Sequence, residues 1–106
     1  MNVPDISESC ITNVEFGKKV KIIKPVNLYG CKIDDDVRIG PFVEIQKGAV
    51  IGSSTKIQSH VFICELVEIG QQSFIGHGVC FINDTFSIGG PAKGDKNLWK
   101  KISRLN

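Results

Sequence analysis

The sequence predicts an all-β fold, a parallel β-solenoid of short strands joined by corners. Two residue series carry this prediction, one recurring every six residues and one standing two positions ahead of it. The first series is Ile33, Ile39, Ile45, Ile51, Ile57, Ile63, Ile69, Ile75 and Phe81. The second series is Val37, Val43, Ala49, Thr55, Val61, Val67, Ser73 and Val79. Every member has an odd number, so on an extended chain of period two all of them point to one side.

This six-residue spacing of apolar residues fits neither an α-helix nor a single straight strand. Six helical residues rotate through roughly 600°, which moves each apolar residue a third of the way around the axis. A straight strand over 37–81 would far exceed the usual length of about 3 to 10 residues, so the chain has to turn once per hexad. Gly40, Gly52, Gly70 and Gly76 each follow an isoleucine of the series, and we expect the missing Cβ to allow a tight corner there.

Strict hexads resemble the left-handed β-helix, a triangular prism with about 18 residues in each coil. The handedness comes from this resemblance, since the usual crossover rule would predict the opposite hand. The pattern is less regular over 20–28 and loses one residue at 29–31, which we interpret as an irregular corner. We therefore expect an N-terminal cap over 1–19, a β-helix of about three and a half coils over 20–84, and an excursion loop with a C-terminal tail over 85–106.

Composition places the chain among small globular domains. Of its 106 residues 42% are hydrophobic, and 13 basic residues face 11 acidic ones, which excludes a disordered tail and a collagen-like fibre. No apolar run approaches the ~18 residues that span a bilayer, and the first residues lack the features of a signal peptide. We expect a cytoplasmic protein with no membrane partner. The basic stretch over 93–106 has no aromatic residue beyond Trp99, so we expect a solvated end and no nucleic-acid partner.

Two features that could suggest a metal site have simpler interpretations. The cysteines form no CxxC pair, so a zinc knuckle or a redox motif is unsupported, and we expect reduced structural thiols at Cys10, Cys31, Cys64 and Cys80. Three adjacent acids at 34–36 alternate faces on a strand and lack loop-spaced ligands, so a solvated corner is favoured over a calcium site. The sequence therefore predicts no metal.

Residues 18 apart should stack at one corner of the prism. Lys47, Glu65 and Asn83 form such a column, with Asp84 beside Asn83. We expect these side chains outside the core, with backbone neighbours about 4.8 Å apart. An ion pair between Lys47 and Glu65 is the expected role of the lysine.

Two further columns contain the histidines at different positions along an edge. One runs through positions 41, 59 and 77, and the other through Phe42, His60 and Gly78. We expect His60 to pack beside Phe42 rather than to act in catalysis, whereas His77 stays available.

Four segments make a resemblance specific: NLYGC at 27–31, FVEIQK at 42–47, SHVFICE at 59–65, and FIGHGV followed by FIND within 74–84. Together they resemble the bacterial hexapeptide-repeat N-acetyltransferases that acetylate the 3-amino group of nucleotide-linked sugars for O-antigen and other surface polysaccharides. This resemblance covers roughly residues 20 to 84. It implies a homotrimer with its active site between subunits, acetyl-CoA lying along the coils as co-substrate, and direct attack of the sugar amine on the thioester.

The resemblance also implies which residues carry the reaction. Glu65 and Asp84 would orient the ammonium group and draw its charge, and Asn83 would hydrogen-bond a sugar hydroxyl or the amine. His77 would take the proton. The candidate catalytic residues are Asn83, Glu65, Asp84 and His77.

Two glycines complete the expected site. Backbone N–H groups near Gly76 and Gly78 would face the oxyanion on the acetyl-CoA thioester, since glycine permits close approach. These two residues are the cofactor-binding candidates.

Two alternatives remain. The family continues after the loop with further coils that complete the CoA groove, whereas this chain stops at Asn106 where hexads should resume; the alternative is a truncated, non-catalytic trimeric β-helix module. A γ-class carbonic anhydrase would use the same prism with three histidine ligands, but the chain has 2 histidines. The sequence does not distinguish a UDP-linked from a dTDP-linked sugar.

Overall fold

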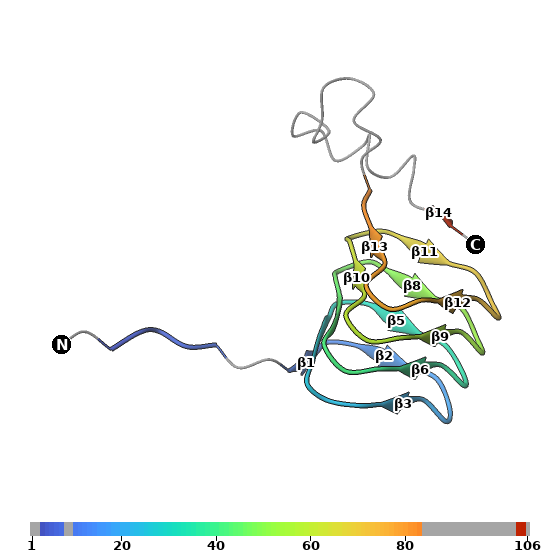
Figure 1. Ribbon diagram of the computed structural model, residues 1–106. Helices are drawn as coiled ribbons and strands as arrows, with labels where there is room; N and C mark the ends of the chain where they lie inside the picture. The colour runs from blue at the N-terminus through green and yellow to red at the C-terminus, as the bar shows by residue number, and fades with distance from the viewer. Residues whose placement is uncertain (1–2, 8–9, 84–103, 106) are drawn as a thin grey trace, which may run out of the picture.

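The computed structural model describes residues 3–7, 10–83 and 104–105, the last two by their backbone alone. Three parallel sheets form the sides of a prism around which the chain winds (Figure 1). Sheet A holds β1 (Ile11–Thr12), β4 (Val26–Tyr29), β7 (Val43–Ile45), β10 (Phe62–Ile63) and β13 (Cys80–Phe81). Sheet B holds β2 (Glu15–Phe16), β5 (Lys32–Ile33), β8 (Val50–Ile51), β11 (Glu68–Ile69) and β14 (Arg104–Leu105). Sheet C holds β3 (Lys21–Ile22), β6 (Arg38–Ile39), β9 (Lys56–Ile57) and β12 (Phe74–Ile75).

This arrangement confirms the predicted fold class, an all-β left-handed parallel β-helix, and it makes about four turns where about three and a half were predicted. All strand pairs are parallel and each joins one coil to the next. Among the described residues no helix is long and apolar enough to cross a membrane. Of the predicted loop and C-terminal tail over 85–106, residues 85–103 and 106 lie outside the described residues. The strand β14 pairs with β11, so the backbone at Leu105 continues sheet B.

The strand register confirms the irregular corner and locates a second one. From β5 to β13 paired residues are 18 apart, as in Ile33 and Ile51. In the first two coils they are 17 apart, as in Ile11 with Leu28 and Leu28 with Ile45. The missing residues lie at the same corner of both coils, between β1 and β2 and between β4 and β5. Because β1 and β2 already pair with the coil above, the solenoid begins at Ile11, inside the segment expected to form a cap.

The interior of the prism is filled by the two series found in the sequence. Side chains that are buried include Ile33, Ile39, Ile45, Ile51, Ile57, Ile63, Ile69 and Ile75, with Val37, Val43, Ala49, Val61 and Val67 from the second series. Thr55 is the polar member, fully buried at 0% exposure. Its hydroxyl donates to the Gly70 carbonyl at 3.0 Å and accepts from the Ser73 N–H at 3.2 Å, so the buried oxygen is satisfied.

The corners are made by residues in the left-handed backbone region. Positive φ angles recur every six residues at Asp36, Phe42, Gly48, Ser54, His60, Leu66, Gln72 and Gly78. None of these is β-branched, in line with the high cost of that region for branched side chains. At one corner Phe42 N–H donates to the Pro25 carbonyl of the coil below at 2.6 Å, and His60 N–H donates to the Pro41 carbonyl at 3.2 Å. Hydrogen bonds between coils therefore hold the strained residues in place.

Two of the glycines that follow an isoleucine, Gly40 and Gly52, serve a different purpose from the one expected. Gly40 and Gly52 do not have positive φ angles. A Cβ at Gly52 would lie 2.6 Å from the Gln71 nitrogen, and one at Gly40 would lie 3.0 Å from the Ser59 nitrogen. Glycine is therefore required at these positions because the next coil passes close by, while the corner conformation itself falls two residues later.

Candidate active site

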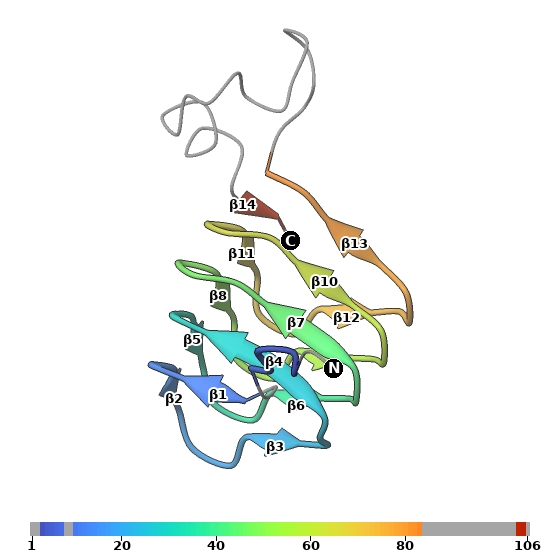
Figure 2. The same ribbon diagram turned by 90° about the vertical axis from the view of Figure 1, so that its left-hand side faces the viewer.

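Sheet A faces the viewer in Figure 2. Its outer face carries polar residues on β4 and β7. Strand alternation places them there: on β4 Val26 and Leu28 are buried while Asn27 and Tyr29 are half-buried on the outside. The pairing of β4 with β7 sets Asn27 directly beside Glu44. We define the sheet A cluster as Asn27, Tyr29, Glu44, Gln46 and Glu65.

Glu44 is the most firmly held member of this cluster. Asn27 Nδ2 donates to its Oε1 at 3.3 Å, and Gln46 Nε2 donates to its Oε2 at 2.8 Å. Each carboxylate oxygen therefore has an amide donor, which holds the group in one orientation. A hollow of about 330 Å³ beside it is lined by residues that include Asn27, Phe42 and Glu44.

Tyr29 lies within the electrostatic influence of both Glu44 and Glu65. Desolvation by burial raises the pKa of the phenol above 10.0, and the charges of Glu44 and Glu65 raise it further. A hydrogen bond with Gln46 acts in the opposite direction. The phenol is therefore neutral at physiological pH, and its hydroxyl can donate a hydrogen bond to a ligand.

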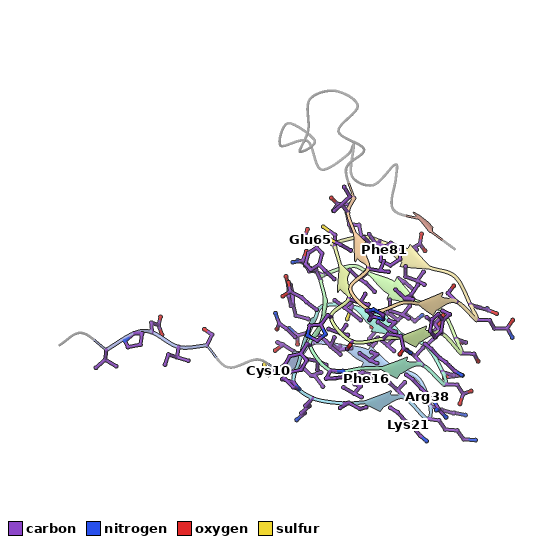
Figure 3. The ribbon with its side chains drawn as sticks, in the orientation of Figure 1. Cys10, Phe16, Lys21, Arg38, Glu65 and Phe81 are labelled. Atoms are coloured by element: carbon purple, nitrogen blue, oxygen red, sulfur yellow. The ribbon has the colours of Figure 1, made fainter. Side chains whose placement is uncertain are left out.

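The structure brings Glu65 and Asn83 together, but not as the column predicted. Asn83 is buried at 4% exposure, so its expected position outside the core is wrong. Its Nδ2 donates to the backbone carbonyl of Glu65 at 2.9 Å, because the side chain turns inward over the coil below and satisfies that carbonyl. Glu65 itself is half-buried near the upper edge of the prism (Figure 3).

The expected ion pair between Lys47 and Glu65 does not form, and neither residue has an ion pair among the described residues. Lys47 is exposed, and its stem packs against Gly30 of the preceding coil, where an added Cβ would lie 3.0 Å from Cγ of the lysine. Stacking at the corner therefore aligns backbones without forcing long side chains to meet.

His77 lies at a different corner, where sheet C passes into sheet A. The residue is exposed, and its side chain has no partner among the described residues. The N–H of Gly78 donates to the Ser59 carbonyl at 3.0 Å, whereas the N–H of Gly76 has no partner in the described part of the chain. Of the two expected oxyanion donors, Gly76 is therefore the one whose N–H has no acceptor among the described residues.

His60 packs as expected. Its ring stacks on Phe42 with centroids 4.9 Å apart and an angle of 24° between the planes. Both rings are exposed at the corner below Gly78, so the stack covers the edge of the prism rather than filling its core.

Within one chain the two halves of the expected site are far apart. His77 precedes β13 and Asn83 follows it, so six residues of extended chain, about 20 Å, separate the two corners. No single amine can touch both groups in one copy. Asp84 lies outside the described residues.

Sequence reasoning assigned no role to Asn27, Tyr29, Glu44 and Gln46, although they lie in the segments that carried the resemblance. A signal was present, since Asn27 precedes Glu44 by the 17 residues of the shortened coil. The spacing of 17 predicts that Asn27 and Glu44 are neighbours only after the position of the missing residue in the coil is known.

The comparisons with known proteins agree with this architecture. The family model described as Bacterial transferase hexapeptide (six repeats) matches residues 30–65. The chain is thus similar to the hexapeptide-repeat transferases over the coils that hold Glu44 and Gln46. No curated protein and no solved structure matches the chain significantly.

Proposed function

We propose that the chain is an acetyl-CoA-dependent N-acetyltransferase whose acceptor is the amino group of a UDP- or dTDP-linked 3-amino sugar used in surface polysaccharides. The hexapeptide match supports an acyl-transfer function at a general level, since proteins built on this repeat include acetyltransferases. The observation that carries the more specific proposal is the Glu44 carboxylate, fixed by Asn27 and Gln46 beside the neutral phenol of Tyr29.

The chemistry of acetyl transfer fits such a cluster. The amine nitrogen attacks the thioester carbonyl carbon, a C–N bond forms, the C–S bond breaks, and the proton of the amine passes to a base or to the leaving thiolate. Glu44 and Glu65 attract the ammonium form to the site, and the Tyr29 hydroxyl donates to a sugar oxygen. His77 accepts the proton, and the N–H of Gly76 stabilises the oxyanion.

The proposed site requires a second copy of the chain. Because about 20 Å of extended backbone separates His77 from Asn83 in one copy, a complete site requires the His77 corner of one subunit and the Glu65 corner of another. A homotrimer, the usual assembly of hexapeptide-repeat proteins, supplies this arrangement. Asp84 would join the carboxylates from its position after Asn83 in sequence.

The test is thiol release from acetyl-CoA with a panel of UDP- and dTDP-linked 3-amino sugars, measured together with oligomeric state by light scattering. Glu44→Gln should lower kcat/KM by roughly ten- to a thousandfold, because one charge-stabilising contact is lost. The matched control is Glu15→Gln, which removes an exposed carboxylate from sheet B and should leave the rate within about twofold.

Two results would contradict the proposal. Equal losses in both variants would mean that general charge, not the sheet A cluster, sets the rate. A folded trimer that shows no acetyl-CoA binding by calorimetry would leave the non-catalytic trimeric β-helix module as the function of this chain.

A further inference from the structure

Sheet C carries a ladder of positive charge on its outer face. The outward residues of β3, β6 and β9 are Lys21, Arg38 and Lys56, and all three are exposed. Strand pairing sets Lys21 directly opposite Arg38, and Arg38 directly opposite Lys56. Figure 3 shows Lys21 and Arg38 projecting from the same side of the prism. Three cations thus stand in register on neighbouring strands.

This arrangement is unfavourable for the protein alone. Neighbouring strands lie about 4.8 Å apart, and like charges directly opposite each other in a sheet are destabilising. On sheet B, by contrast, residues of opposite charge are paired across neighbouring strands, since Glu15 lies opposite Lys32. Within the described residues, none of the three cations on sheet C has an ion pair or a side-chain hydrogen bond. The ladder is therefore a place where an anion would relieve repulsion.

The cations line a hollow rather than a convex surface. A depression of about 330 Å³ is lined by Lys19, Lys21, Asp36, Arg38, Ser54 and Lys56. Four cations surround it against one carboxylate. Long basic side chains around a concave site can converge on several oxygens of one phosphate chain, and Arg38 can bind two of them at once.

A second hollow continues the first along the same sheet. It measures about 510 Å³, shares Lys21 and Arg38 with the first, and has Ile23, Gly40 and Pro41 along its walls. Gly40 has no side chain to fill this space, and Ile23 is 62% exposed beside it. Gln58 and Ser59 also line it, and their side chains have no hydrogen-bond partners among the described residues. The groove is thus cationic at one end and apolar, with two polar groups, at the other.

From this geometry we infer that the groove on sheet C binds a small molecule with a di- or triphosphate chain. The phosphates lie against Lys21, Arg38 and Lys56, and an uncharged ring system covers Gly40 within reach of Gln58. The combined volume is in the range of small-molecule sites. The inference does not rest on acetyl transfer, since the sheet A cluster lies on another side of the prism.

Isothermal calorimetry on the full chain tests this, with tripolyphosphate, UDP, ADP, CoA and orthophosphate as probes. Tripolyphosphate and UDP should bind at least tenfold more tightly than orthophosphate, because a chain of phosphates can contact several of the cations at once. Arg38→Gln should weaken both by about tenfold or more. Lys32→Gln removes the same charge from sheet B and should change the affinities less than about threefold. Tighter binding of CoA than of UDP and ADP would identify the acyl donor as the ligand of the groove. Tighter binding of UDP or ADP than of CoA would identify a free nucleotide as the ligand.

A stability measurement separates this role from a merely structural one. Without ligand, Arg38→Gln should melt at the same temperature as the wild type or higher, because a like-charge contact is removed. At one fixed tripolyphosphate concentration, the wild type should gain more stability than Arg38→Gln. Gln58→Ala should weaken the binding of UDP but not that of tripolyphosphate. An unchanged affinity for UDP would show that the ring does not bind beside Gln58.

Three outcomes would overturn the inference. One is the absence of tripolyphosphate binding at millimolar concentration. Another is an equal loss of affinity in Arg38→Gln and Lys32→Gln, which would mean general charge attraction. The third is a change of oligomeric state in Arg38→Gln with phosphate binding intact, which would mean that a second copy of the chain covers the ladder.

Discussion

The side-chain amide of Asn83 donates to the backbone carbonyl of Glu65, 2.9 Å away and 18 residues earlier in the chain. This bond joins the last described coil to the one beneath it at the corner between sheets A and B. It makes Asn83 a structural support of the corner as well as a neighbour of the proposed acceptor site. The sheet A cluster and this corner are therefore mechanically linked.

Asn83→Ala should destabilise the chain by about 1 to 3 kcal/mol, because the Glu65 carbonyl loses its donor in a buried setting. Urea unfolding monitored by circular dichroism measures this free energy. The exposed Asn13 on the first coil offers the control Asn13→Asp, which leaves the upper corner intact. A stability unchanged in Asn83→Ala, together with a large loss of kcat/KM, would mean that Asn83 acts on the substrate alone.

Ile57→Ala should lower the free energy of unfolding by about 2 to 5 kcal/mol, because Ile57 is 2% exposed and its loss leaves a cavity in the prism. The matched control is Ile23→Ala, where the side chain is 62% exposed and the change should stay within about 0.5 kcal/mol. Denaturant titration of both variants measures the difference. Equal effects would contradict the inward orientation of the hexad series.

Thr55→Val should destabilise the fold by about 1 to 3 kcal/mol, although valine is more apolar and of similar size. The Ser73 N–H would lose the hydroxyl that accepts its hydrogen bond, and the buried donor would stay unsatisfied. Thr55→Ser keeps the hydroxyl and loses only one methyl group, about 1 kcal/mol. Thermal melting compares the two, and a valine variant more stable than the serine variant would show that the bond contributes little.

Stability should fall as pH rises from about 9 to 11, partly through Cys31. Burial raises the pKa of this thiol from 9.0 to about 11. In that window the folded chain keeps the proton that the unfolded chain has lost, so the free energy of unfolding decreases with pH. The contribution is complete below pH 9 and amounts to at most about 3 kcal/mol.

Unfolding in urea at pH 8, 9.5 and 11 measures this slope, and Cys31→Ala isolates it. Ala49 occupies the equivalent position one coil above, so alanine fits the column. The variant should show a shallower decline than the wild type over the same range. Identical slopes would assign the pH dependence to other groups, such as Tyr29, whose pKa is also raised.

The sequence by itself determined the coil, its period and its interior. A six-residue repeat of Ile33, Ile39 and their successors is compatible with neither a helix nor a straight strand, so the backbone path follows from spacing alone. The slip at Tyr29-Gly30-Cys31 was readable for the same reason, since it breaks an otherwise strict count.

Only the tertiary structure decided how the corners and outer faces are used. Phe42 and His60 adopt the left-handed backbone conformation because carbonyls of the coil below accept their N–H groups, and Phe42 does so two positions beyond Gly40. Asn83 turns inward because a carbonyl lies beneath it. Lys21 meets Arg38 at a spacing of 17, but Arg38 meets Lys56 at 18, so the ladder becomes visible only when successive coils are set in register. The six-residue repeat determines the path of the backbone, whereas the register between neighbouring coils determines which side chains and backbone groups come into contact.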